Sequence, residues 1–364
     1  MNAVETNVYR PVIGDYSCPC PINLSPVDWR QGMLIRSANW LGDAVMSLPG
    51  VYRLHNLVPP GGCTTVLAPA KLADLWHSVP WIDQVITFAG RRLSAAERRQ
   101  VRAAEPGVSV VLPNSFGAAW DLWRSGGGYI VGRAGRGRTW LLRGRLPEWR
   151  REAGHDKAHE VRKYLELAAA CGSRHWYTDY PALEPQLTDE ARAAMDALVP
   201  VNERLLVIVP GAAYGPAKQW PVDHFNAVAR WWTAQHGRVI VCGATGEEAV
   251  AMSAITDCSG AVSIAGKSSV AQLMYVLAGV DCVLTNDSGA MHLAAGLGKD
   301  GVAIFGSTDP VATGPIGGRW VVMRHPLPCS PCLQRTCRRT DIPYECLKTI
   351  APQNVIDSIE YLIS

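Results

Sequence analysis

The sequence lacks several features that would assign it to other broad classes of protein. It has no run of eighteen or more apolar residues, so no helix is expected to span a membrane. Residues 1–25 carry Asp and Glu and lack an apolar central region, so we expect neither a secretory signal nor an obvious membrane anchor. No internal repeat or low-complexity tract is found. We therefore expect a cytoplasmic protein whose eleven cysteines are mostly reduced thiols.

The composition permits a large core, and the charge is informative only locally. With 48% hydrophobic and 18% charged residues, disorder is not expected, and 364 residues suit two domains. The net charge of +3 is too small to indicate nucleic acid as a partner. One Gly-rich segment nearly lacks acids, and we expect it to bind an anionic partner, the alternative being a solvated loop. Its cations are Arg124, Arg133, Arg136, Arg138, Arg143, Arg145, Arg150 and Arg151.

Apolar runs and helical patterns alternate through two halves of the chain, which predicts an α/β fold with parallel sheets. The first half has expected strands at 33–36, 65–67, 84–88, 108–112 and 129–131, and expected helices at 43–57, 95–104 and 159–171. The second has expected strands at 205–209, 238–242, 262–264, 281–284 and 302–305, and expected helices at 222–236, 247–258, 270–277 and 290–297.

This pattern predicts two doubly wound, Rossmann-like domains whose sheets face one cleft with their carboxyl ends. We expect an N-terminal extension over residues 1–30, domains over 31–185 and 186–350, and a C-terminal helix over 351–364. The linker is expected at Tyr180–Arg204, where prolines flank one short helix.

The most informative motif is Thr285–His292, which joins an apolar strand to a small-residue helix. The start of a helix leaves N–H groups unpaired and carries a partial positive charge, so it suits a phosphate. His292 lies four residues after Ser288 and can share its face. The plainer alternative is a helix capped by Asp287 or Ser288 with nothing bound.

Three other loops that follow strands carry candidate functional residues. The first, Ser37–Asp43, has no Gly-x-Gly-x-x-Gly, which argues against a nicotinamide enzyme, and its Asp43 could accept a proton from a sugar hydroxyl. The second, Pro210–Pro221, is rich in Gly and Pro and delivers one cation, Lys218, suited to a diphosphate. The third carries Glu247, an acid placed to bond ribose hydroxyls or simply to begin a helix.

Four cysteines near the C-terminus have a spacing that suits a four-thiolate zinc or iron–sulfur site. They are Cys329, Cys332, Cys337 and Cys346. The chain has no second Cys-x2-Cys pair at this site, so partly buried thiols or a disulfide are the favoured alternatives.

Taken together, these motifs resemble those of the bacterial lipopolysaccharide heptosyltransferases of glycosyltransferase family 9, from about Met33 to the C-terminus. The resemblance implies a GT-B fold, no required cofactor, and inverting transfer of heptose from ADP-heptose to the inner core of a lipopolysaccharide acceptor. The matching pieces are Trp40–Asp43, Pro210-Gly211 with Gly215–Pro221, Thr285–Gly289 with His292, Phe305–Pro310, and Cys329–Cys332 with Arg335–Cys337.

The resemblance also implies roles for individual residues. Asp43 matches the catalytic base and Lys218 the cation on the donor diphosphate. The other expected donor-binding residues are Glu247, Asn286, Asp287, Ser288, Gly289 and His292, and the expected acceptor-binding residues are Asn39, Trp40, Arg133, Arg136 and Arg138. The implied partners are a nucleotide sugar and a lipid-linked oligosaccharide, with no nucleic acid. A transient contact with the membrane surface and a peripheral position on the inner membrane are compatible with these partners.

The chain also departs from the family pattern. Residues 1–30 match nothing in it, Ala213-Tyr214 stands where the family more often has Glu-Phe, and the first half is rich in Trp. The alternatives are therefore a family member with another donor or acceptor sugar and a nucleotide-sugar enzyme such as an epimerase. Further alternatives are a redox or iron–sulfur protein built on the cysteines and a peripheral membrane-binding protein that uses the Arg segment.

Overall fold

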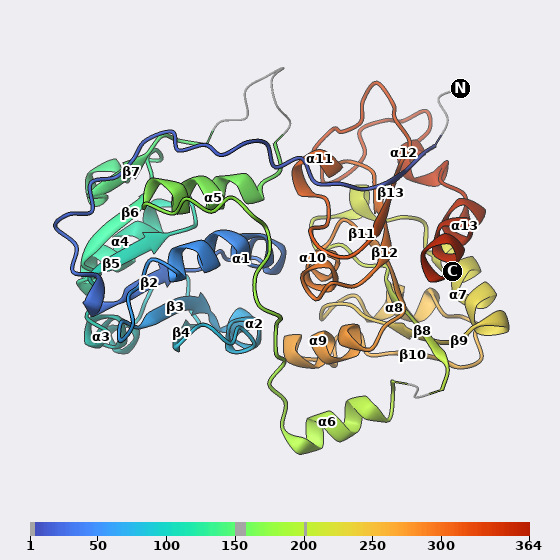
Figure 1. Cartoon of the computed structure of the whole chain (residues 1–364). Coiled ribbons are helices and arrows are strands. Elements are labelled where there is room, and N and C mark those ends of the chain that lie inside the picture. The colour runs from blue at the N-terminus through green and yellow to red at the C-terminus, as the bar shows by residue number, and fades with distance from the viewer. Residues whose placement is uncertain (1–3, 150–157, 200–201) are drawn as a thin grey trace. The chain divides into compact units, whose positions relative to one another are not determined.

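The computed structural model describes residues 4–149, 158–199 and 202–364 (Figure 1). Within them the chain forms two compact units, each built around one sheet. Residues 12–186 form one unit. Residues 187–364, together with the N-terminal residues up to Pro11, form the other. Among the described residues, no helix has the length and apolar character needed to cross a bilayer.

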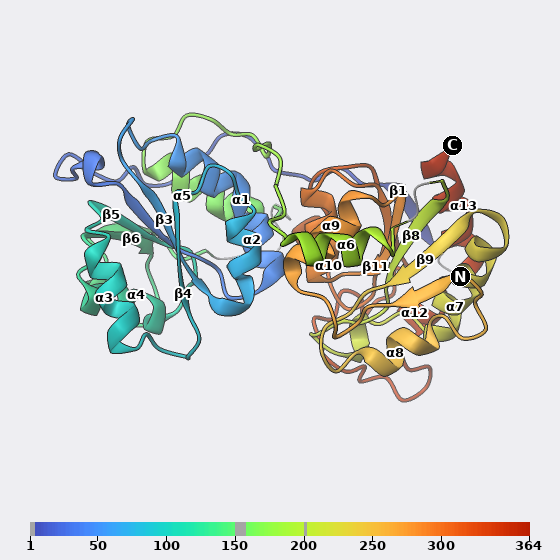
Figure 2. The same ribbon diagram turned by 90° about the horizontal axis from the view of Figure 1, so that it is seen from below.

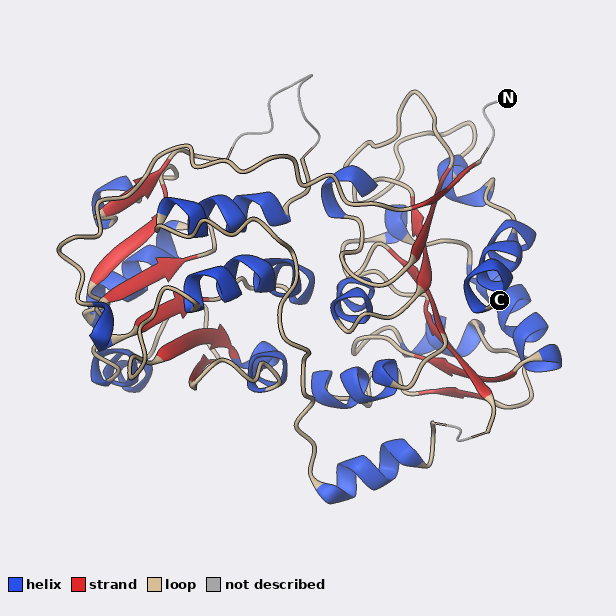
Figure 3. Ribbon diagram, viewed as in Figure 1, coloured by secondary structure: helices blue, strands red, loops and turns tan. Residues whose placement is uncertain are grey.

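The unit of residues 12–186 contains six parallel strands in the order β4-β3-β2-β5-β6-β7, with helices on both faces of the sheet (Figures 1 and 3). Its strands are β2 (Met33–Arg36), β3 (Thr64–Pro69), β4 (Gln84–Phe88), β5 (Val108–Val111), β6 (Tyr129–Arg133) and β7 (Gly144–Leu146). Its helices are α1 (Leu41–His55), α2 (Ala73–His77), α3 (Ala95–Ala103), α4 (Phe116–Ser125) and α5 (Val161–Ala170), with 3-10 turns η1 (Trp29–Gln31), η2 (Ala70–Leu72) and η3 (Thr139–Leu141).

The other unit contains seven strands in the order β1-β13-β12-β11-β8-β9-β10, all parallel except β1. Its strands are β1 (Glu5–Val8), β8 (Arg204–Val209), β9 (Gly237–Val241), β10 (Ala261–Ser263), β11 (Cys282–Asn286), β12 (Gly301–Phe305) and β13 (Trp320–Arg324). Its helices are α6 (Asp189–Asp196), α7 (Val222–Gln235), α8 (Glu248–Ser253), α9 (Val270–Ala278), α10 (Gly289–Gly296), α11 (Pro310–Thr313), α12 (Glu345–Lys348) and α13 (Pro352–Ile363), with the 3-10 turn η4 (Pro216–Lys218).

The central strands are buried along their whole length and are mostly apolar, because helices cover both faces of a parallel sheet. Every residue of β2, β5, β11 and β12 is buried. In the unit of residues 187–364, Phe225 and Trp232 of α7 pack into the same core as β8 and β11. The tryptophan and phenylalanine of α7 are thus core residues, as their helical spacing predicts.

The predicted strands and helices agree with the structure to within a few residues, but the N-terminal segment does not form a separate extension. Strand β1 pairs antiparallel with β13, from Glu5 opposite Arg324 to Val8 opposite Val321. Arg324 Nε also donates to Glu5 Oε2 at 2.5 Å. Residues 12–30 belong to the other unit instead. The partner strand of β1 lies about three hundred residues away in sequence, and no local pattern indicates such a pairing.

In each unit the direction in which strands are added reverses once, which creates a switch point where neighbouring loops diverge. The reversal falls between β2 and β5 in one sheet and between β8 and β11 in the other. Such switch points are where open α/β sheets bind ligands. Both candidate sites described below lie at the carboxyl ends of these strands.

Candidate functional site

The loops after β8, β11 and β12 converge on a cation–carboxylate pair. Lys218 Nζ lies 2.5 Å from Asp287 Oδ2, and Thr308 Oγ1 donates to the same oxygen at 2.6 Å. The Lys218 side chain is 14% exposed and that of Asp287 is 5% exposed, so both charges lie largely out of water. The sequence predicts a role in donor binding for Lys218 and Asp287. Thr308 belongs to the Phe305–Pro310 motif, for which no role is predicted. The pair supplies a positive and a negative group at the switch point.

Asn286 fastens the loop after β8 to the end of β11. Its Oδ1 accepts from Trp220 N at 3.0 Å, and its Nδ2 donates to Pro210 O at 2.7 Å. Asn286 is fully buried, so these bonds replace water around two backbone groups. The structure thus gives this residue a role in holding the Lys218 loop, and its expected contact with a donor stays a prediction.

We therefore expect Asn286→Ala to lower the free energy of unfolding by about 2–4 kcal/mol, because two buried backbone groups lose their partners. Chemical denaturation measures this change. Asn226→Ala is the matched control, because the Asn226 amide donates to Thr256 O at an exposed position. The control should cost less than about 1 kcal/mol. Unchanged stability of Asn286→Ala would contradict the structural role.

The turn at the start of α10 is capped by Ser288. Its Oγ accepts from Met291 N at 3.3 Å and lies 3.1 Å from Thr285 Oγ1. Gly289 begins the helix, while His292, one turn on, is 5% exposed. Of the two caps considered from the sequence, the structure has Ser288, and Asp287 contacts Lys218 instead. The Gly-x-Gly-x-x-Gly at Gly296–Gly301 joins a helix to a strand, the reverse of the dinucleotide-binding order.

Glu247 comes from the loop after β9 and lies against the loop after β8. Its Oε2 accepts from Ala244 N at 2.8 Å. A Cβ atom built on Gly211 would collide with the Glu247 carboxylate, so residue 211 has to be glycine for this approach. Helix α8 begins at Glu248, one residue later than predicted, and Glu247 therefore belongs to the loop. A carboxylate thus lies next to the Lys218 loop, and its expected contact with ribose stays a prediction.

Tyr214, which stands where the family more often has Phe, contacts two cations of this site. Lys218 Nζ lies 5.1 Å and Arg335 Cζ 5.2 Å from the centroid of the Tyr214 ring. The Tyr214 hydroxyl donates to Leu333 O at 2.8 Å. In the sequence Arg335 lies near the cysteines and far from Lys218, so its position beside Lys218 could not be predicted. The aromatic ring links two cations of the same site.

The cysteine-containing segment braces this site. Ala217 N donates to Arg335 O at 3.0 Å, and Ser330 Oγ donates to Gly306 O at 2.7 Å. All four cysteines are free thiols, and burial, followed by the charges of Cys332, Cys329 and Cys337, raises the pKa of Cys346 to about 11. In the described part of the chain, no group of three or more His, Cys, Asp or Glu side chains is arranged to hold a metal ion. Through its two hydrogen bonds the segment contacts the loops after β8 and β12.

A second candidate site lies at the β2–β5 switch point of residues 12–186. A cavity of about 230 Å³ is lined by Asn39, Trp40, Asp43, Arg133 and Lys163, among others. Asp43 is in the first turn of α1, where the helix dipole favours a carboxylate. Gly50 lets α1 approach α5 closely, since a Cβ atom there would fall 2.7 Å from the Tyr164 backbone. That approach brings the start of α5 to the pocket that contains Asp43.

Lys163 supplies positive charge beside Asp43. Burial disfavours the charged form of Lys163, but its interactions with Tyr164, Glu160 and Asp43 outweigh this effect and raise the pKa of the ammonium above its ordinary value. Lys163 Nζ also contacts Glu160 Oε2 at 2.6 Å. Burial raises the pKa of Tyr164 to about 12, so its hydroxyl stays protonated. An ammonium group thus lies close to the Asp43 carboxylate.

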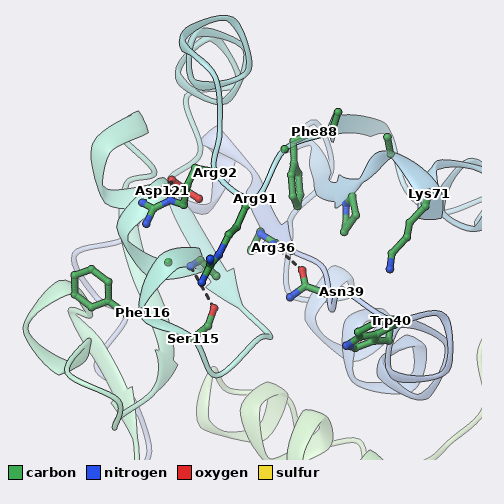
Figure 4. Close-up of a pocket in the computed structure, with 16 residues that line it drawn as sticks. Arg36, Asn39, Trp40, Lys71, Phe88, Arg91, Arg92, Ser115, Phe116 and Asp121 are labelled. Carbon is green, nitrogen blue, oxygen red and sulfur yellow. Dashed lines mark hydrogen bonds and ion pairs between the residues drawn. The ribbon is translucent and has the colours of Figure 1, made fainter. Parts of the chain in front are cut away.

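A larger cavity of about 900 Å³ adjoins the small one, and Asn39 and Trp40 line both. Figure 4 shows its cations at the end of β2 and in the segments that follow β3 and β4. They are Arg36, Lys71, Arg91 and Arg92, with aromatic rings from Trp40, Phe88 and Phe116. Asp121 also lines it but is paired with Arg92 at 2.8 Å. The cavity is therefore cationic, which suits an anionic ligand.

The individual cations of this cavity are held in different ways. Arg36 Nη2 donates to Asn39 Oδ1 at 2.8 Å, and its guanidinium lies 4.5 Å from the Phe88 centroid. Burial lowers the pKa of Arg36 to about 10, so it remains charged near neutral pH. Lys71 Nζ lies 4.2 Å from the Trp40 centroid. These four cations were not identified from the sequence, although each lies at the end of a predicted strand or in the loop after it.

The three arginines expected to bind the acceptor differ in exposure. Arg136 is exposed, but Arg133 and Arg138 are buried, because β6 and η3 run through the segment treated as a loop. Arg133 Nη2 bonds Glu166 at 2.8 Å, and Arg138 Nε donates to Arg133 O at 2.9 Å. Two of the three guanidiniums thus already bond within the fold, although Arg133 still lines the cavity of Asp43. Arg150 and Arg151 lie outside the described residues.

Two doubly wound units with polar loops at their switch points define the architecture of the GT-B glycosyltransferases. Solved structures agree with this class of fold. The structure of the ADP-heptose LPS heptosyltransferase II of Escherichia coli matches with a TM-score of 0.72 at 24% identity, covering 91% of this chain and 98% of that one. A glycosyltransferase family 9 protein from Veillonella parvula DSM 2008 matches with a TM-score of 0.75 at 17% identity, covering 93% and 99%.

Residues 95–342 match the profile of glycosyltransferase family 9 (heptosyltransferase), and the chain belongs to this family. It is 28% identical over 348 residues to lipopolysaccharide heptosyltransferase 2 of Escherichia coli K12, covering 91% of this chain and 98% of that protein. The resemblance to this family inferred from the motifs is confirmed. The protein is therefore a glycosyltransferase.

Proposed function

We propose that the protein transfers heptose from ADP-heptose to an inner-core lipopolysaccharide acceptor with inversion at the anomeric carbon. The observation that carries the proposal is the pair of polar sites, one at the switch point of each sheet, in a chain of this family. In support, relatives that match nearly their whole length are named lipopolysaccharide heptosyltransferase 2. A related heptosyltransferase, WaaC of Escherichia coli, has been solved with ADP.

In the proposed reaction, the donor occupies the site at the β8–β11 switch point. The bond between the anomeric carbon and the diphosphate breaks, and ADP leaves with the electron pair. Lys218 and the N–H groups at the start of α10 stabilise the negative charge that develops on the leaving diphosphate. Asp287 holds Lys218 in position, and Glu247 is placed to accept bonds from ribose hydroxyls. These residues require no metal ion for the step.

On the acceptor side, Asp43 acts as the general base. An acceptor hydroxyl oxygen bonds to the anomeric carbon on the face opposite to the departing ADP, and its proton passes to the Asp43 carboxylate. The hydroxyl becomes strongly acidic only as its oxygen forms this bond, so a carboxylate of ordinary basicity suffices. Lys163 supports the ionised form of Asp43 before the transfer.

The cationic cavity is proposed to hold phosphate or carboxylate groups of the acceptor, with Asn39 and Trp40 at its border with the catalytic pocket. The loops after β3 and β4 would then supply most of the contacts with the acceptor, in place of the Arg124–Arg151 segment. The exposed cations Lys71 and Arg91 are the ones free to change partners when a ligand enters, since Arg36 is buried and Arg92 is paired.

We expect Lys71→Ala/Arg91→Ala to raise KM for a phosphorylated acceptor by about 10- to 100-fold, because two charge-assisted contacts are lost. KM for the donor should stay unchanged. Initial rates at several ionic strengths measure the effect, which should shrink as salt screens the charges. Arg174→Ala/Lys267→Ala removes two exposed cations elsewhere and serves as the control. An unchanged acceptor KM would refute the role of the cavity.

A further inference from the structure

Helix α4 exposes Phe116 and Trp123 to solvent, whereas Trp120 is half-buried and packs against the core of its unit. Its buried residues include Ala118, Ala119, Leu122 and Ser125. Phe116, Trp120 and Trp123 recur at the i, i+4 and i+7 positions and thus share the opposite face. A helix that covers a sheet normally buries its large apolar side chains, so the exposure of Phe116 and Trp123 is unusual.

Trp140 of η3 completes a cluster of four rings with Phe116, Trp120 and Trp123, which we call the aromatic face. Ring centroids within it lie 5.1 Å apart for Trp120 and Trp123, 6.0 Å for Trp123 and Trp140, and 6.4 Å for Phe116 and Trp140. Phe116 is 39%, Trp123 51% and Trp140 61% exposed. Contiguous exposed aromatic side chains of this kind mark an interaction site more often than a plain surface.

The segment that carries the aromatic face has exposed cations and no exposed acid. Between residues 116 and 146 the exposed arginines are Arg124, Arg136, Arg143 and Arg145, and the single acid, Asp121, is buried and paired with Arg92. Arg124 lies 6.0 Å from the Trp120 centroid, and Arg102 of the neighbouring α3 donates to Arg124 O at 3.4 Å (Figure 2). Trp rings with Arg at their border match the headgroup region of an anionic bilayer, where Trp is enriched and Arg attracts acidic lipids.

The aromatic face is continuous with the large cavity. Phe116 belongs to both, and Figure 4 places it at the opposite side of the view from Lys71 and Trp40. A surface held at a bilayer by Trp123 and Trp140 would therefore keep the cavity next to the headgroups. The described helices include none that could cross the bilayer, so any such contact has to lie at its surface.

We propose that the aromatic face is a membrane-docking surface that binds anionic phospholipid headgroups and brings the cationic cavity to a membrane-anchored acceptor. The purpose of this docking rests on the proposed function, because the acceptor in that function is lipid-linked. The docking itself rests on the exposed aromatic rings of α4 and η3, on their mutual contacts through Trp120, and on the one-sided charge. In this proposal the aromatic rings of α4 and η3 contact the membrane together with Arg124. The sequence alone indicated a contact made by the arginines of the Arg124–Arg151 segment.

The test is sedimentation of the full chain with vesicles of phosphatidylcholine alone or mixed with phosphatidylglycerol. We expect binding to the anionic vesicles only, with an affinity that falls as salt is raised. Trp123→Ala/Trp140→Ala should weaken it by about tenfold or more, since interfacial burial of two exposed rings is lost. Tyr177→Ala/Tyr361→Ala, which removes two exposed rings outside the aromatic face, should bind as the wild type does.

The outcomes separate this proposal from the enzymatic one. Trp123→Ala/Trp140→Ala should still transfer sugar to a delipidated, water-soluble acceptor, which also shows that it is folded. Asp43→Asn should lose transfer yet still bind vesicles. Equal vesicle binding by wild type and Trp123→Ala/Trp140→Ala, or no binding by wild type, would overturn the docking surface. Self-association of the wild type that the double substitution abolishes, without vesicle binding, would instead make this face an interface between copies of the chain.

Discussion

Asp43→Asn is expected to lower kcat for sugar transfer by about 10²- to 10⁴-fold, the range that a positioned general base contributes. The amide keeps the shape of the side chain but cannot take up the proton of the acceptor hydroxyl. Donor affinity should stay the same, because Asp43 belongs to the pocket of α1 and α5. Single-turnover assays with saturating donor and acceptor measure the loss.

Two controls make this result specific. Glu190→Gln removes an exposed carboxylate of α6 and should transfer sugar at the wild-type rate. Thermal unfolding of Asp43→Asn shows whether the pocket beside Lys163 has been disturbed. A folded Asp43→Asn protein with nearly wild-type kcat would exclude Asp43 as the base. In that case another proton acceptor in the same cavity would have to be sought.

Lys218→Ala is expected to weaken binding of ADP-heptose by about 10- to 100-fold and to lower kcat as well. The ammonium is largely buried and belongs to the loop held by Asn286, so its interaction with a diphosphate is poorly screened. The loss in kcat follows because negative charge on the leaving group is greatest in the transition state. Calorimetric titration of ADP and ADP-heptose gives the affinities, and initial rates give kcat.

The substitution also leaves Asp287 without its cation, which could destabilise the site on its own. Lys218→Ala/Asp287→Asn removes both charges and separates the two effects. We expect it to recover stability but not affinity for ADP-heptose. Lys348→Ala, an exposed cation on α12, should bind the donor normally. Wild-type affinity in the folded double variant would contradict the role of Lys218.

Most of the fold could be predicted from the sequence because its strands are short apolar runs that end in polar turns. Strands β2 and β4 begin and end at the predicted residues, and helix α7 differs from its prediction by one residue. Helix α4 was missed because apolar residues lie on both of its sides, with Ala118, Ala119 and Leu122 buried and Phe116 and Trp123 exposed, so the periodicity does not single out a core face. Strand β1 was missed because its partner is distant in sequence.

The candidate sites could be predicted only in part. Lys218 and Asp287 follow predicted strands, and parallel strands bring their loops to one edge of the sheet. Their direct contact depends on which strands are neighbours, and the sequence does not state that order. The prediction that Arg133 and Arg138 bind the acceptor relied on the number of arginines in the Arg124–Arg151 segment, and that number does not show which of them are buried. Arg138 is fully buried and bonds backbone carbonyls. Lys71 and Arg91, which lie outside the Arg segment, line the large cavity instead.

The most direct test of the proposed function is the transfer reaction itself, followed by mass spectrometry of the acceptor. Purified protein would be given ADP-heptose and a lipopolysaccharide acceptor truncated in its inner core. We predict that the acceptor gains the mass of one heptosyl residue while ADP is released, and that Asp43→Asn gives no gain in the same time. If a folded, donor-binding wild type leaves every inner-core acceptor unchanged, or transfers only a different sugar, the heptosyl-transfer proposal is contradicted.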